Sequence, residues 1–154
     1  MIDSHCHLAG DEFESDLREV IDRAMGAGVT AALVIIGAED EAEVSRAASL
    51  RGAWPAVRFS IGVHPHTAGQ FAEDPSAARR LVEERIRANT AARALGEIGL
   101  DYHYDFSPRD VQQAVFREQI RAARSCGLPV VIHTREAEED TFRILEEEIG
   151  RAHV

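Results

Sequence analysis

The residues best suited to chemistry begin near the N-terminus, where His5 and His7 are separated by a single residue. Side chains at positions i and i+2 of a β-strand lie on the same face, so a strand here would point both imidazoles toward one cation. Neutral imidazole is the commonest metal-binding side chain in proteins. The pair therefore predicts a metal site, with two ordinary polar residues at a strand end as the alternative. Cys6 would lie on the opposite face, where a small core residue is expected.

A third candidate ligand, Glu97, lies in an apolar run between Gly96 and Gly99. A carboxylate in such a strand is costly unless a cation or a metal neutralises it, which favours a metal-binding role. The glycines would let the backbone and a ligand approach closely, and Asp101 is expected either to orient a ligand or to cap the next turn. His133 ends another short apolar run and is the fourth candidate. These nitrogen and oxygen ligands suit zinc, manganese, iron or a mixed site that also accepts magnesium.

Three further side chains could contact a substrate. His64 and His66 surround a proline after another apolar run, and they are either substrate contacts or exposed residues of a proline turn. Arg135 could bind a phosphate through two parallel hydrogen bonds, or pair with neighbouring glutamates on the surface. His103 is expected to be an exposed loop residue.

These residues must be positioned by alternating strands and helices. Short apolar runs alternate with amphipathic stretches, which is the pattern of β/α units whose parallel sheet is covered on both faces. The candidate ligands lie at the ends of these runs, where β/α barrels carry their active sites. We expect strands at about 1–7, 31–37, 57–63, 94–100 and 130–134.

The expected helices are marked by their ends as well as by their apolar spacing. Ser107 would cap the clearest helix with its hydroxyl, Pro108 would occupy the first helical position, and Gly127 would end it. An acidic cluster near the C-terminus predicts the solvated face of a final helix. The other helices are expected at about 13–27, 39–50 and 76–87.

Composition restricts the possible functions. With 154 residues, the chain is long enough for one domain with a sizeable core. Its net charge of −10 weighs against a broad nucleic-acid-binding face, although a small metal-centred site could still accept a phosphate-bearing end.

No run is long enough to cross a membrane and no signal peptide is apparent, so a cytoplasmic protein without a membrane partner is expected. Its two cysteines are not in a CxxC pair and are expected to be reduced thiols.

Four segments resemble, in the same order, the N-terminal motifs of the TatD family of metal-dependent hydrolases. The most specific is the run Gly-Glu-Ile-Gly-Leu-Asp-Tyr. The resemblance implies a TIM-type (β/α)₈ barrel, a two-metal site and, for many members, deoxyribonuclease activity on DNA ends. The matching segments are 1–8, 61–66, 96–102 and 129–137.

The resemblance also assigns roles to individual residues. It implies that His5 and His7 hold one divalent ion, that Glu97 bridges both ions, and that His133 holds the second. The ions would be Mg²⁺, Mn²⁺ or Zn²⁺. The substrate would be a DNA end or another phosphodiester. The candidates for gripping its phosphate are His64, His66 and Arg135.

The sequence is shorter than the family pattern requires. A (β/α)₈ barrel takes about 250 residues, so we expect an incomplete TIM-type barrel with about the first five of its eight units. The family's histidine on the sixth strand and aspartate on the eighth have no counterpart here. The last six residues match the translation of a common sequencing adapter up to its stop. We therefore expect a truncated barrel domain at 1–148, an artificial tail at 149–154, and little activity from the chain alone.

Two alternatives to a TatD-like nuclease stay open. The first is another barrel metallohydrolase, acting on amides, lactones or phosphotriesters. Such enzymes often bridge their metals with a carboxylated lysine, whereas every basic Lys or Arg position in this sequence is arginine, so Glu97 weighs against this alternative. The second is an inert or weakly metal-binding fragment.

Overall fold

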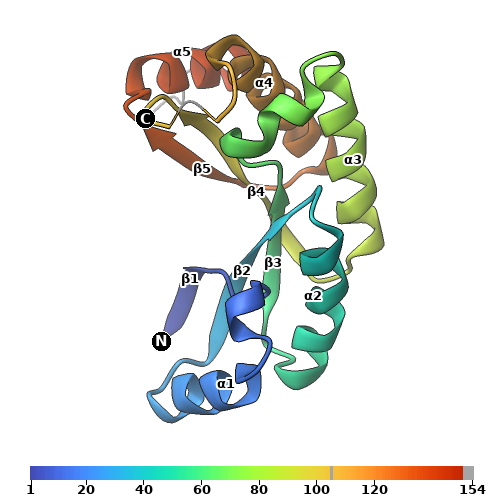
Figure 1. Ribbon diagram of the computed structural model, residues 1–154, viewed down its shortest axis with the longest axis vertical. Coiled ribbons are helices and arrows are strands. Elements are labelled where there is room, and N and C mark those ends of the chain that lie inside the picture. The colour runs from blue at the N-terminus through green and yellow to red at the C-terminus, as the bar shows by residue number, and fades with distance from the viewer. Residues whose placement is uncertain (105, 151–154) are drawn as a thin grey trace.

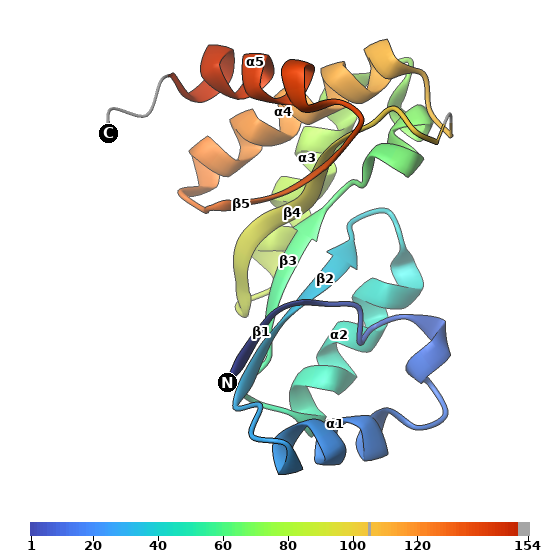
Figure 2. The same cartoon turned by 90° about the vertical axis from the view of Figure 1, so that its left-hand side faces the viewer.

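The computed structural model of the protein describes residues 1–104 and 106–150. Five parallel strands form one sheet in the order β1-β2-β3-β4-β5, and each strand is followed by a helix. Figures 1 and 2 show the helices on the convex side of the curved sheet, while its concave side is uncovered. The expected fold class is confirmed: this is an incomplete (β/α) barrel of five units. Of the expected tail at 149–154, residues 151–154 lie outside the described residues.

The strand positions agree closely with those expected from the apolar runs. The largest difference is at β4, which begins two residues before the expected 94 because Ala92 pairs with Phe59 of β3. The strands are β1 (Ile2–Cys6), β2 (Ala31–Gly37), β3 (Arg58–Gly62), β4 (Ala92–Asp101) and β5 (Val130–Arg135).

The helices differ from expectation at their ends, and the second continues to Ala53 instead of ending at 50. The first was expected to begin at residue 13, but a separate 3₁₀ turn ends there and the α-helix begins at Leu17. The second begins at Glu41, because the Asp40 carboxylate accepts hydrogen bonds from the next backbone amides and caps the helix. The helical elements are η1 (Asp11–Phe13), α1 (Leu17–Gly26), α2 (Glu41–Ala53), η2 (Pro65–Phe71), α3 (Pro75–Ala88), α4 (Arg109–Cys126) and α5 (Glu138–Ile149).

The expected cap of α4 is wrong. Pro108 precedes the first helical residue and, as the N-cap residue, forms no capping hydrogen bond with its side chain. The Ser107 hydroxyl instead accepts a hydrogen bond from the Gly69 amide (2.8 Å) and donates one to the His66 carbonyl (2.9 Å). Ser107 therefore ties η2, which follows β3, to the loop after β4. At the other end, Gly127 ends α4 in the left-handed conformation, as expected.

The hydrophobic core lies between the sheet and its helices. Phe59 of β3, Leu95 of β4 and Phe116 of α4 are all at most 1% exposed. The two edge strands are less well covered: Ile2 on β1 is 69% exposed and Phe142 on α5, after β5, is 64% exposed. Among the described residues, no helix is long and apolar enough to cross a membrane.

Gly99 permits the close contact between β4 and β5 on which the position of His133 depends. It pairs with His133, has φ of +146°, and a Cβ atom built on it would lie 1.9 Å from the His133 carbonyl oxygen. The glycines of β4 were expected to let a ligand approach. The close neighbour of Gly99 is instead the backbone of the adjacent strand.

We predict that Gly99→Ala lowers the free energy of unfolding by about 2–4 kcal/mol, because the methyl group meets both an unfavourable φ and a backbone oxygen. Gly52→Ala is the matched control: Gly52 lies in α2, and a methyl group added there would point into open space. This change should stabilise the chain by about 0.5–1 kcal/mol. Urea unfolding followed by circular dichroism measures both, and equal effects would contradict the argument.

Candidate metal centre

The first group of candidate ligands joins β1 to β4 across the sheet's concave face. His5 Nε2 lies 3.3 Å from His7 Nε2 and 3.2 Å from Glu97 Oε2. β1 and β4 are not neighbours in the sheet, because β2 and β3 lie between them. The contact between His5 and Glu97 therefore crosses the concave face. Ligand atoms of a tetrahedral zinc site lie roughly 3.3 Å apart, as follows from zinc–nitrogen bonds of about 2.0–2.1 Å. The three side chains therefore fit a cation.

The second group uses the other oxygen of the same carboxylate. His133 Nδ1 lies 3.1 Å from Glu97 Oε1, and His64 Nε2 lies 3.3 Å from the same nitrogen. Glu97 thus directs Oε2 toward the first group and Oε1 toward His133. A carboxylate with its oxygens divided in this way has the geometry of a ligand shared by two cations. The structure brings together all four side chains that the sequence suggested as metal ligands.

The charges of this region explain how Glu97 tolerates its position, where its side chain is 14% exposed. The hydrogen bond with His133 lowers the pKa of Glu97, although burial opposes the shift. The same hydrogen bond raises the pKa of His133. A carboxylate oxygen and an imidazole lone pair facing each other at 3.1 Å need a positive charge between them. A charged His133 ring supplies it with its own proton, whereas a neutral ring can accept the Nε2–H of His64, which faces the same nitrogen at 3.3 Å. A divalent cation would take the place of that proton.

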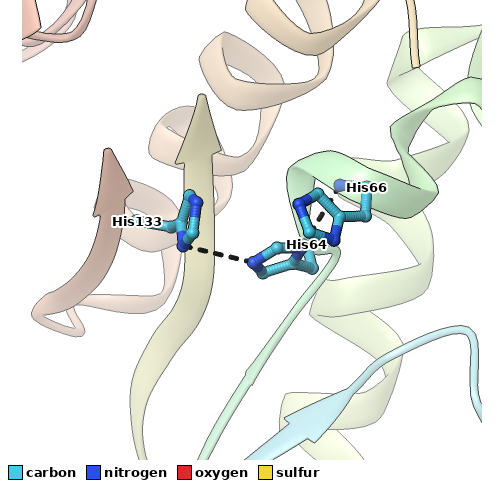
Figure 3. Close-up of side chains that lie close together, drawn as sticks. All are labelled: His64, His66 and His133. Atoms are coloured by element: carbon cyan, nitrogen blue, oxygen red, sulfur yellow. Dashed lines mark hydrogen bonds between the residues drawn. The ribbon is translucent and has the colours of Figure 1, made fainter. Parts of the chain in front are cut away.

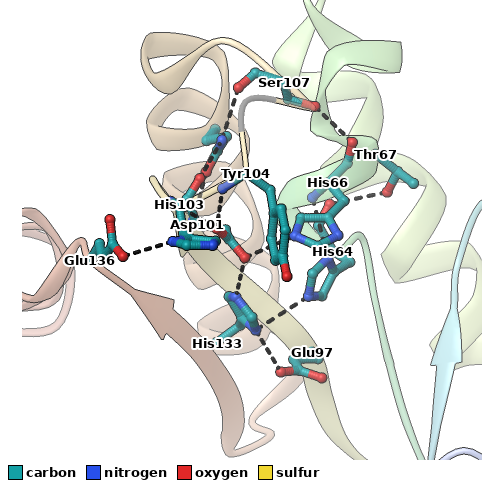
Figure 4. A network of polar contacts seen from close by, with 11 residues as sticks. His64, His66, Thr67, Glu97, Asp101, His103, Tyr104, Ser107, His133 and Glu136 are labelled. Atoms are coloured by element: carbon teal, nitrogen blue, oxygen red, sulfur yellow. Dashed lines mark hydrogen bonds and ion pairs between the residues drawn. The ribbon is translucent and has the colours of Figure 1, made fainter.

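Asp101 lies behind this centre and is 1% exposed (Figure 4). Its Oδ2 lies 2.8 Å from His66 Nε2 and 2.9 Å from His133 Nε2, while its Oδ1 accepts hydrogen bonds from the His103 and Tyr104 amides. Burial would raise the pKa of Asp101, but these hydrogen bonds outweigh it and hold the pKa well below the usual range. The sequence left open whether Asp101 orients a ligand or caps a turn, and the structure shows contacts for both.

His64 is held as a neutral imidazole. Its Nδ1 accepts a hydrogen bond from the His66 amide (3.2 Å), which places the proton of the neutral ring on Nε2 (Figure 3). Burial, together with the neighbouring His133 and His66, lowers the pKa of His64 to about 4. Near neutral pH His64 therefore directs an N–H donor toward His133 Nδ1, 3.3 Å away.

The three imidazoles in Figure 3 are close enough together to suggest a further metal site. Their hydrogen bonds argue against it. Asp101 is ionised and can only accept, so His66 and His133 both donate to it through Nε2. With the His64 proton also on Nε2, the group does not offer three lone pairs to one ion. We describe His64, His66 and His133 as a hydrogen-bonded cluster.

Glu39 belongs to the same region. The sequence analysis did not identify it as a site residue and placed it at the beginning of a helix. It follows β2 and lines a hollow of about 200 Å³ with His7, His64 and Glu97. Its Oε1 accepts a hydrogen bond from Thr67, whereas its Oε2 is buried without a partner among the described residues. Burial raises the pKa of Glu39. Only its place directly after an apolar strand could have indicated a site residue.

The remaining candidates lie at the rim. The Arg135 guanidinium is over the Tyr104 ring, 4.6 Å from its centroid, and forms no ion pair with a glutamate in the part of the chain that the structure describes. It is exposed, so its donors are free to meet an anion. His103 is exposed, as expected, and pairs with Glu136 at 2.7 Å.

Comparisons with known proteins agree with this geometry. The family model described as TatD related DNase matches residues 2–154. A Bacillus subtilis protein named uncharacterized metal-dependent hydrolase YabD is 38% identical over 99% of this chain and 57% of its own length. A protein of Enterobacter lignolyticus named 3'-5' ssDNA/RNA exonuclease TatD is 35% identical over 94% of this chain and 54% of its own length.

A solved structure shows the same fold. The crystal structure of YJJV, a TatD homolog from Escherichia coli K12, superposes with a TM-score of 0.80 and 27% identity, covering 96% of this chain and 56% of that one. The chain thus spans about half the length of the curated relatives it matches. Because the family model matches nearly every residue, the chain belongs to the TatD family of metal-dependent hydrolases and DNases.

Proposed function

We propose that this chain carries half of a two-metal centre for phosphodiester hydrolysis. The observation that supports the proposal most directly is the division of Glu97 between two groups of imidazoles, at 3.2 Å and 3.1 Å. In this proposal His5, His7 and Glu97 hold one divalent cation, and Glu97 and His133 hold the other. Mg²⁺, Mn²⁺ and Zn²⁺ are all candidates, since nitrogen and carboxylate ligands occur together.

The cations, when bound, would supply Lewis acidity: they activate a water molecule and neutralise charge on the phosphate. The chain's own residues then bind and orient the substrate. His64 keeps its proton on Nε2, which faces His133 Nδ1 at 3.3 Å, and it would be suited to donate that hydrogen bond to a phosphate oxygen once a cation occupies the His133 nitrogen. The exposed guanidinium of Arg135 is suited to bind a phosphate through two hydrogen bonds. We assign His66 a weaker role in substrate binding, because Asp101 already holds its Nε2.

We propose DNA ends, or other phosphodiesters, as the substrate of the whole protein. The name of the Enterobacter lignolyticus relative refers to single-stranded DNA and RNA. The hydrogen-bond donors of His64 and Arg135 are suited to bind the phosphate oxygens of such a substrate. The acidic surface favours a local site over a broad nucleic-acid-binding face. We expect no membrane partner, and a cytoplasmic location stays a prediction.

Two alternatives follow from different observations. An amide, lactone or phosphotriester hydrolase would use the same histidines, since such pairs occur in several barrel metallohydrolases. An inert or impaired fragment would be explained by the coverage of only about half of each relative.

A panel assay would test the proposed function. Residues 1–148, continued with the second half of a TatD-family barrel, should shorten end-labelled single-stranded DNA in the presence of Mg²⁺ or Mn²⁺. Chelation with EDTA should abolish this activity, and added Mn²⁺ should restore it. Small amides, lactones and phosphotriesters should be poor substrates. Hydrolysis of those compounds with no action on DNA would contradict the nuclease proposal.

A further inference from the structure

Asp101 receives more hydrogen bonds than a turn-capping residue needs. Its Oδ1 alone completes the turn, because it accepts from the His103 and Tyr104 amides at 3.1 Å and 3.0 Å. Its Oδ2 lies outside the turn and meets the two imidazoles of His66 and His133. The two oxygens therefore have separate tasks, one within the loop after β4 and one between three elements of the fold.

The position of this carboxylate is itself fixed. Gln112 of α4 accepts a hydrogen bond from the Asp101 amide (2.8 Å) and donates one to its carbonyl (3.0 Å). Gln112 is also 1% exposed, so this pair of contacts is buried against the helix layer. Asp101 consequently has little freedom to follow its partners. The imidazoles must adjust to the carboxylate.

We propose that Asp101 is a positioning residue of the metal centre: it fixes the tautomer of His133, so that the neutral ring carries its proton on Nε2 and turns the Nδ1 lone pair toward Glu97. A neutral ring that carries its single proton on Nε2 leaves the Nδ1 lone pair free to bind a cation. The same Oδ2 holds His66, which places the metal ligand and the η2 segment in one hydrogen-bonded unit. This inference rests on the proposed metal centre.

Asp101→Asn separates the two tasks of the side chain. An asparagine keeps one carbonyl oxygen, which can still accept from the His103 and Tyr104 amides. It replaces Oδ2 with an NH₂ group that can only donate. His133 would then meet a donor at Nε2 and would favour the other tautomer, with its proton on Nδ1 and no lone pair toward Glu97.

Glu136→Gln is the matched control. Glu136 is also a carboxylate paired with a histidine, through His103 at 2.7 Å, but neither residue contacts the candidate ligands. Both variants remove one negative charge from the same region. A general effect of charge would therefore appear in both, whereas an effect on the His133 tautomer would appear only in Asp101→Asn.

The test has one readout without metal and one with it. Nitrogen-15 NMR of the histidine rings reports the tautomer in the metal-free chain, at a pH above the titration of His133, with a His133→Asn variant to assign its signals. We expect the Nε2–H form in the wild type and in Glu136→Gln, and the Nδ1–H form in Asp101→Asn. An Nδ1–H tautomer in the wild-type chain overturns the proposal, whether or not the variant folds.

Zinc titration of the same proteins supplies the second readout. Asp101→Asn should weaken the cation held by Glu97 and His133 by about 10–100-fold and leave the cation held by His5 and His7 unchanged. Equal zinc affinities in Asp101→Asn and wild type would overturn the positioning role. Absence of zinc binding to the wild type would contradict the metal centre instead, while the NMR result would still decide the tautomer.

Discussion

Replacing Glu97 with glutamine is expected to remove both cations together, an effect that no other single substitution at the candidate ligands should produce. Glutamine retains the shape of the side chain but loses the negative charge, and one of its two terminal atoms becomes a donor. Glu97 contacts His5 with one oxygen and His133 with the other. Whichever way the amide turns, one group loses its oxygen ligand and both groups lose the charge. Affinity should fall by at least about 100-fold at each position.

Zinc content and zinc titration would measure this result. The wild-type chain should show two classes of site, the tighter one with three protein ligands and the weaker one with two. Glu43→Gln is a suitable control, because Glu43 lines the same hollow but its carboxylate contacts the Gly37 amide and no imidazole. It should keep both classes. If Glu97→Gln retained one ion at wild-type affinity, Glu97 would not be the shared ligand.

The strand bounds and the candidate ligands that the sequence predicted are determined by local sequence patterns. The sequence predicted β2 at its observed bounds, because its apolar run is continuous and is followed by polar residues. It also pointed to His5, His7 and His133 as metal-binding groups near strand ends, and to Glu97 as a carboxylate within an apolar strand. Parallel strands end at the same edge of a sheet, so such residues are brought together by any fold of this class.

The missed features depend on contacts between distant segments. A serine directly before a proline is typical of a helix cap. The Ser107 hydroxyl instead forms hydrogen bonds with Gly69 and His66, 38 and 41 residues away. Glu39 becomes a site residue because β2 and β3 are neighbours and place it beside Thr67. The double role of Asp101 requires the β4–β5 register that sets Gly99 opposite His133. Local spacing alone could not specify these partners.

The edges of the sheet lead to the second large expected effect. β1 and β5 each have one strand neighbour, and large apolar side chains near them are exposed, among them Ile2 and Phe142. In the proposed whole barrel, three further β/α units would cover these edges and close the concave face. The family resemblance adds a sixth-strand histidine and an eighth-strand aspartate to the ligands. The chain by itself offers His133 and Glu97 for the second cation and leaves the opposite wall of the site open.

We therefore predict that residues 1–154 alone hydrolyse DNA ends at least about 100-fold more slowly than residues 1–148 continued into a full barrel, because small errors in ligand and substrate position already reduce rates by this factor. Initial rates on end-labelled single-stranded DNA, at equal protein and Mn²⁺ concentrations, would measure the difference. Glu97→Gln should abolish the activity of the full barrel, which excludes a contaminating nuclease. Equal rates from the two proteins would show that five β/α units suffice and would contradict the requirement for ligands from the second half. A full barrel that binds two cations but does not act on DNA would retain the metal centre and refute the proposed substrate.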